Sequence, residues 1–236
     1  MQDRISIPSN AVDEDLIINN ARRIPVCICI EKSVYTRPKI NEIRNSMNKL
    51  KKAVMDDPHT FCSVEMCIII FSDRSVVYKE FSLFKETDPE DFSDFEEQFR
   101  GAKEITNPDL CGALELAVRL LKLRKSDYRL TGKRDSFPAR LMLLGSGQKA
   151  KDISRIAEVI CGYGKSLEVW PICVSDKDFS WENYKCLRKD GKVFKASDDI
   201  SKLFDDVGKS LAELSSSSAT AFDSLKANAK GWEEYK

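Results

Sequence analysis

Few residues of this 236-residue chain combine the type and spacing that catalysis needs. Its single histidine, His59, excludes a two-histidine zinc site and would have to serve any histidine-based triad alone. Ser146 lies between two glycines, as the nucleophile of an α/β-hydrolase does, but that motif needs two more residues of context and a histidine base. Residues 145–149 also lack the spacing of a phosphate-binding loop. We therefore predict no catalytic residues and do not expect an enzyme.

Composition and charge narrow the possible functions further. The 38 basic residues equal the 38 acidic ones, so the chain lacks the basic excess that nonspecific nucleic-acid binding needs. No apolar run approaches the ~20 residues of a membrane span, and the acidic N-terminal segment does not resemble a secretory signal. Several of the eight cysteines lie in apolar, strand-like runs, and none forms a Cys-x-x-Cys pair. These features predict a cytoplasmic protein with reduced thiols and neither a nucleic-acid nor a membrane partner.

Short apolar runs alternate with amphipathic stretches, the pattern of β–α–β units on a parallel sheet. The more polar run 76–81 predicts an antiparallel edge strand. Buried strands are predicted by the runs 24–30 and 64–71, and further strands by 140–144, 167–174 and the short run 192–194. The expected fold class is thus α/β: a single doubly wound, mostly parallel, Rossmann-like sheet with one antiparallel edge strand and helices on both faces.

Helical periodicity fills the segments between these strands. Amphipathic helices are predicted over 40–54, 114–121, 153–160 and 200–214. The acidic stretch 85–97 predicts a surface helix held by Phe92, Phe95 and Phe99. We expect an N-terminal extension over 1–21, one domain over 22–214, and a tail over 215–236 that could form one more helix.

Three loops of such a sheet meet beyond the carboxyl ends of the strands, where ligands bind in open α/β folds. The order and spacing of short segments in and around these loops resemble those of the von Willebrand factor A (VWA) family. Within that family, the chain is most similar to the bacterial tellurite-resistance, TerY-like branch. The resemblance covers roughly residues 22–218, and the segments that carry it are 24–26, 31–35, 57–58, 69–71, 109–114, 143–147, 203–204, 210–211 and 215–217.

VWA domains commonly bind Mg²⁺ or Mn²⁺ at a metal-ion-dependent adhesion site. Its parts are Asp-x-Ser-x-Ser after the first strand, a Thr before the third helix and an Asp after the fourth strand. The resemblance places Glu31, Ser33 and Tyr35 in the first motif, Asp109 at the Thr and Ser146 at the last Asp. A carboxylate is lost and a bulky phenol is gained, whereas Mg²⁺ needs oxygen ligands in near-octahedral geometry. The resemblance therefore implies a degenerate site at Glu31, Ser33, Asp109 and Ser146 without a cofactor.

Two readings of these four residues stay open. They could hold Mg²⁺ or Mn²⁺ weakly, which would make the chain a divalent-metal-dependent ligand-binding domain. Alternatively, Asp109 caps the third helix, and Ser33 and Ser146 form turns. The second reading is favoured.

Two further regions are candidates for docking a partner. Residues 122–140 hold seven basic residues against two acidic ones without clear periodicity, which predicts a long exposed loop. This loop is either merely solvated or complementary to an acidic partner. The aromatic residues of the tail either anchor a partner or pack on the domain. The candidate docking residues are Tyr35, Lys122, Arg124, Lys125, Arg129, Lys133, Arg134, Trp232 and Tyr235.

The function favoured by these features is a non-enzymatic, intracellular protein–protein interaction module. The TerY-like branch works beside a protein kinase and a protein phosphatase in stress or metal-resistance systems, so the resemblance implies phosphosignalling partners. A hydrolase or nucleotide-binding enzyme on a Rossmann-like sheet is the remaining alternative, although no acid–base pair is expected at the strand ends.

Overall fold

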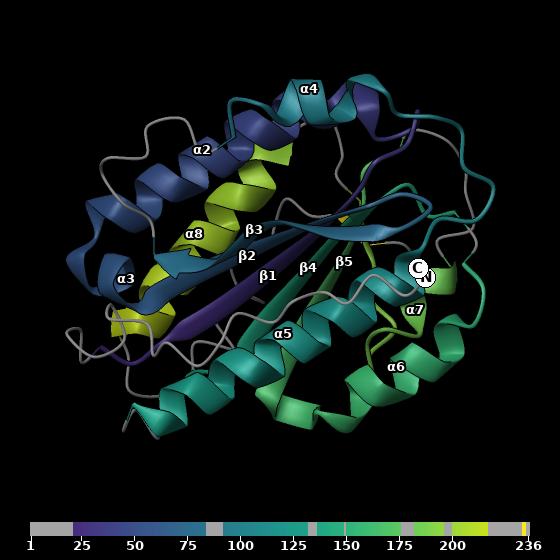
Figure 1. Cartoon of the computed structure of the whole chain (residues 1–236). Coiled ribbons are helices and arrows are strands. Elements are labelled where there is room, and N and C mark those ends of the chain that lie inside the picture. The colour runs from purple at the N-terminus through teal and green to yellow at the C-terminus, as the bar shows by residue number, and fades with distance from the viewer. Residues whose placement is uncertain are drawn as a thin grey trace.

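The computed structural model describes residues 21–83, 92–131, 136–148, 150–175, 182–195, 200–216 and 233–234. These residues build one twisted sheet with the strand order β3-β2-β1-β4-β5-β6-β7 (Figure 1). The strands are β1 (Ile24–Glu31), β2 (Val64–Phe71), β3 (Ser75–Leu83), β4 (Ala139–Gly145), β5 (Leu167–Cys173), β6 (Phe194–Lys195) and β7 (Glu233–Glu234).

Strands β2, β1, β4, β5 and β6 are parallel, and β3 pairs antiparallel with β2 at one edge. All residues of β1, β2 and β4 are buried, because helices cover both faces of the sheet. The predicted fold class is therefore confirmed. The two-residue strand β7 pairs antiparallel with β6 at the opposite edge. At these two positions the C-terminal tail is a strand rather than a helix.

Seven helices of the described residues are divided between the two faces of the sheet (Figure 1). One layer holds α2 (Ile40–Asp56), α3 (Pro58–Ser63), α4 (Phe95–Arg100) and α8 (Ile200–Ser216). The other holds α5 (Leu110–Leu130), α6 (Ile153–Gly162) and α7 (Glu182–Lys185). Two short 3-10 helices, η1 (Arg37–Lys39) and η2 (Gly164–Ser166), precede α2 and β5. Each layer packs an apolar stripe on the sheet, as the helical periodicity predicted.

The acidic stretch predicted as a surface helix is described from Phe92 onward. Its helix, α4, begins at Phe95, and the rings of Phe92, Phe95 and Phe99 are fully buried. Their centroids lie 5.5 and 6.1 Å apart in succession, a normal spacing for packed aromatic rings. The phenylalanines therefore hold the helix, as predicted, while the residues 84–91 lie outside the described part of the chain.

The prediction of a long basic loop over 122–140 was wrong. Helix α5 continues without interruption to Leu130, and Arg140 lies within β4. The helical signal was hidden because two of its inward positions are occupied by polar residues. Arg124 and Tyr128 are buried and bind the buried carboxylate of Glu65, each at 2.6 Å.

Glu65 is the centre of a buried ionic network at the start of β2. Besides Arg124 and Tyr128, it pairs with Arg23, whose Nε lies 3.4 Å from its Oε1. Burial, reinforced by the negative charge of Glu65, raises the pKa of the Tyr128 hydroxyl far above its usual range. Tyr128 therefore stays a neutral hydrogen-bond donor. A buried carboxylate is tolerated only when it is paired in this way.

Candidate functional site

The carboxylate of Glu31, at the carboxyl end of β1, is completely buried. Its main contact is with Ser146, which follows β4. The Ser146 backbone N–H donates to Oε2 at 2.8 Å, and its hydroxyl lies 2.7 Å from Oε1 and 2.9 Å from Oε2. The structure thus brings together two of the four predicted metal-site residues, and both oxygens of Glu31 are occupied by Ser146.

Tyr184 of α7 closes the same crevice, and the sequence analysis did not anticipate it. Its hydroxyl accepts a hydrogen bond from the Gly147 N–H at 3.3 Å. A Cβ at position 145 would overlap this hydroxyl and lie 3.1 Å from the Glu31 carboxylate, so the close approach requires glycine there. Burial raises the pKa of the Tyr184 hydroxyl, and the nearby Glu31 raises it further. The phenol is therefore neutral and fills the space beside the carboxylate.

Ser33 and Thr36 form a buried turn after β1. The Thr36 hydroxyl lies 2.5 Å from the Glu31 carbonyl oxygen, and the Tyr35 backbone N–H donates to the Ser33 hydroxyl at 3.3 Å. The Tyr35 ring points elsewhere, since its hydroxyl lies 2.5 Å from a carboxylate oxygen of Glu104. That hydrogen bond, which favours the protonated phenol, raises the pKa of Tyr35. The polar groups of this loop serve the turn.

Asp109 caps helix α5 and does not contact Glu31. Its Oδ1 accepts a hydrogen bond from the Gly112 N–H at 3.1 Å, and its Oδ2 accepts one from the Ser75 hydroxyl at 2.8 Å. A Cβ at residue 112 would collide with this carboxylate. The alternative reading of Asp109 as a helix cap therefore agrees with its geometry.

The described residues at these strand ends are not arranged to hold a divalent cation. A magnesium site needs several oxygens that converge on one point at short distance. Instead, the Glu31 oxygens bind Ser146, and those of Asp109 bind Gly112 and Ser75. Among the described residues, no group of three or more histidine, cysteine, aspartate or glutamate side chains is arranged to hold a metal ion.

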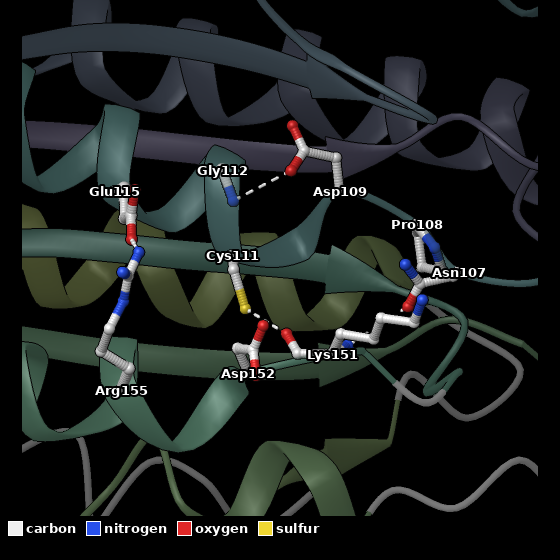
Figure 2. Close-up of a pocket in the computed structure, with 9 residues that line it drawn as sticks. All are labelled: Asn107, Pro108, Asp109, Cys111, Gly112, Glu115, Lys151, Asp152 and Arg155. Atoms are coloured by element: carbon white, nitrogen blue, oxygen red, sulfur yellow. Dashed lines mark hydrogen bonds and ion pairs between the residues drawn. The ribbon is translucent and has the colours of Figure 1, made fainter.

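A pocket of about 290 Å³ lies beside Asp109, between the first turns of α5 and α6 (Figure 2). Carboxylates and cations line it together, including the ion pair of Arg155 with Glu115. The Cys111 thiol lies 2.9 Å from the Lys151 carbonyl oxygen, and burial raises its pKa to about 11. The thiol is thus protonated at neutral pH, which makes it a poor nucleophile.

The predicted docking residues on α5 fall into two groups. Lys122 and Arg129 are exposed and Lys125 is half-buried on one face, whereas Arg124 faces the core and binds Glu65. Arg124 is therefore not a surface residue, contrary to the prediction. Lys133, Arg134, Trp232 and Tyr235 lie outside the described residues.

Sequence reasoning missed three residues of the strand-end region: Thr36, Ser75 and Tyr184. Thr36 directly follows a motif that was recognised, so its position could have drawn attention. Ser75 and Tyr184 reach the region from β3 and α7, far along the chain, and neither carries a local motif.

Within the described residues, no helix has the length and apolarity needed to cross a bilayer.

No protein-family model matches the chain, and no curated protein sequence matches it. Solved structures are similar, although at low sequence identity. BatB from Bacteroides thetaiotaomicron superimposes with a TM-score of 0.58 at 11% identity, over 82% of this chain and 100% of that one. A von Willebrand factor type A protein from Catenulispora acidiphila superimposes with a TM-score of 0.55 at 12% identity, over 83% and 42% of the two chains.

The pilus adhesin SpaC from Lactobacillus rhamnosus GG has a TM-score of 0.62 at 9% identity, over 83% of this chain and 30% of its own. This chain thus spans less than half of the adhesin and of the Catenulispora protein, and all of BatB. At such identities the similarity defines the fold alone. The chain has the VWA fold.

Proposed function

We propose that this chain is a non-enzymatic protein–protein interaction module, a VWA-like adaptor. The observation that carries the proposal is the closed strand-end crevice. Glu31, whose carboxylate is buried there, is bound on both oxygens by Ser146, and Tyr184 fills the adjacent space. In open α/β folds this is where a substrate or cofactor would bind. Its polar groups instead bind one another, which makes this end of the sheet a preformed, rigid scaffold.

Neither this crevice nor the neighbouring pocket between α5 and α6 offers groups suited to catalysis. The Cys111 thiol and the Tyr184 hydroxyl both have raised pKa values, which disfavours the anions that act as nucleophiles or bases. The one histidine lies in α3, in the helix layer opposite that of α5 and α7. An adaptor needs none of these groups, because recognition depends on surface shape and charge.

We further propose that the module works inside the cell, beside a protein kinase and a protein phosphatase in a stress or tellurite-resistance system. This part rests on the resemblance of the sequence to the TerY-like branch. The thiol chemistry supports an intracellular location: all eight cysteines are free, and each lies among the described residues.

Affinity purification with the full chain tests the adaptor function. The tagged chain is incubated with native lysate at low and at moderate salt, and bound proteins are quantified by mass spectrometry. We expect one partner in stoichiometric amount that survives moderate salt. Recovery of no stoichiometric partner under either condition contradicts the proposal.

Calorimetry with Mg²⁺ and Mn²⁺ tests the metal-dependent alternative. Because Glu31 and Asp109 are occupied by protein donors, we expect no heat of binding and an unchanged Tm at millimolar metal. A ligand present at about 100 times its Kd would stabilise the fold by about 2.7 kcal/mol, which a melting curve resolves. A rise in Tm with either metal would favour a metal-dependent ligand-binding domain.

A further inference from the structure

A second pocket, of about 410 Å³, lies far from the strand-end crevice, between the C-terminal half of α5 and the connection from η2 to β5. Its walls combine apolar and basic side chains. Val118, Leu121 and Leu167 are almost fully buried and form an apolar floor. We call this pocket the α5 groove.

Three cations line one side of the α5 groove. Lys122, Lys125 and Arg129 also line it and follow one another at intervals of three and four residues, so they share one face of the helix. Seven residues of α-helix separate the first from the last, a span of ~10 Å. The groove therefore presents an apolar floor beside a short row of positive charge.

No carboxylate neutralises this row within the described part of the chain. The residues that line the groove include no aspartate or glutamate. Two carboxylates adjacent in sequence to lining residues have other partners, because Asp127 pairs with Arg124 and Glu168 pairs with the buried Arg140. The pKa of Lys125 is lowered by burial and by the charges of Arg129 and Arg140. An anion placed beside these cations would relieve their mutual repulsion.

We propose that the α5 groove binds an acidic peptide segment of a protein partner. One aliphatic or aromatic side chain of the segment occupies the apolar floor, and flanking carboxylates pair with Lys122, Lys125 and Arg129. The Nζ of Lys125 already donates to the Ser166 carbonyl oxygen at 2.9 Å, which fixes it at the rim. The inference rests on the proposed adaptor function and names its docking surface and the chemistry of its partner.

The same features favour a peptide over a nucleic acid. Nucleic acids are held by extended basic surfaces that follow many phosphates, and they need stacking or groove contacts for specificity. The α5 groove offers three cations over a short span, and the chain has no net charge. An apolar floor suits a single side chain better than a sugar–phosphate backbone.

Charge reversal with a matched control tests the proposal. Random peptides of about 12 residues are selected on the full chain by display, and fluorescence anisotropy measures the affinity of the enriched peptides. We expect acidic sequences with one large apolar residue. Their affinity should fall about tenfold or more for the variant K122E/K125E/R129E. The control K52E/K103E/K189E reverses three exposed lysines elsewhere and should bind within about twofold of wild type.

A second variant separates the groove from nonspecific attraction. Ser126 is exposed and lines the groove, so S126W fills it without changing the charge. We expect S126W to weaken the same peptides about tenfold while its Tm stays near that of wild type. If S126W binds as wild type does, charge alone attracts the peptides and the groove proposal is overturned. Tighter binding of single-stranded DNA than of any selected peptide also overturns it.

The two proposals fail in distinguishable ways. A lysate partner that wild type and K122E/K125E/R129E recover equally would overturn the groove and leave the adaptor function intact. Recovery of a partner by wild type but not by the charge-reversal variant, with the control unaffected, supports both.

Discussion

Glu31 shows how one residue decides the chemistry of the strand-end crevice. A fully buried carboxylate requires charged or hydrogen-bonding partners. Ser146 supplies both a backbone N–H and a hydroxyl to the oxygens of Glu31. The Ser146 hydroxyl acts as a hydrogen-bond donor to this carboxylate.

Replacement of Ser146 by alanine tests this bond. The variant loses the hydroxyl that approaches both oxygens of Glu31, and the carboxylate stays buried. We expect the free energy of unfolding to fall by about 2 kcal/mol, the usual scale for a hydrogen bond to a charged group. Urea denaturation measures it.

The matched control is Ser126→Ala, which changes an exposed serine on α5 and should leave stability within about 0.5 kcal/mol of wild type. Equal stability of the two variants would contradict the assigned role of Ser146.

Helix α5 combines a structural and a recognition role on different faces. Its inward face carries Arg124 and Tyr128, which complete the network around Glu65, and an adjacent face carries the cations of the α5 groove. In sequence both faces appear as one basic segment without periodicity. Only the packing of the helix on the sheet separates the arginine that is buried from those that are exposed.

Two arginines of α5 provide a paired test of this division. Arg124→Ala removes a buried partner of Glu65, and breaking a buried ion pair costs about 3–5 kcal/mol. Arg129→Ala removes an exposed cation little more than one turn away and should change stability by less than about 0.5 kcal/mol. Thermal and urea unfolding of both variants measure the difference. Similar losses for the two would mean that the Glu65 network contributes no particular stability.

At the scale of the whole molecule, the Glu31 crevice and the α5 groove lie at opposite ends of the sheet strands. The carboxyl ends of β1 and β4 carry the Glu31 crevice, whereas the α5 groove lies near the start of β4 and β5. A partner in the groove would therefore leave the strand-end face free. This separation suits an adaptor, which must contact more than one protein.

Removal of residues 219–236 tests what the tail contributes. Its described part, β7, pairs with β6 at the sheet edge through Phe194 and Lys195. We expect a folded protein with a lower Tm, because the truncation exposes that edge. Binding of the enriched peptides to the α5 groove should be unchanged. An unchanged Tm together with lost partner binding would instead identify the tail as a partner anchor.

The sequence by itself determined the layered fold and two residues of the strand-end crevice, Glu31 and Ser146. Short apolar runs such as 24–30, bounded by polar residues, favour buried strands, and helical periodicity places the covering helices. Because parallel strands end at the same edge, Glu31 and Ser146 could be predicted to meet.

Only the tertiary structure decided which donors are engaged and which charges are buried. Tyr184 reaches the crevice from α7, which is distant in sequence. Arg124 of α5 is buried because the carboxylate of Glu65, on β2, neutralises its charge. Such contacts depend on the distance between side chains that are remote in sequence. The local sequence pattern contains no information about that distance. The buried Arg124 and the exposed Arg129 therefore cannot be distinguished from sequence, and only the packing of α5 on the sheet separates them.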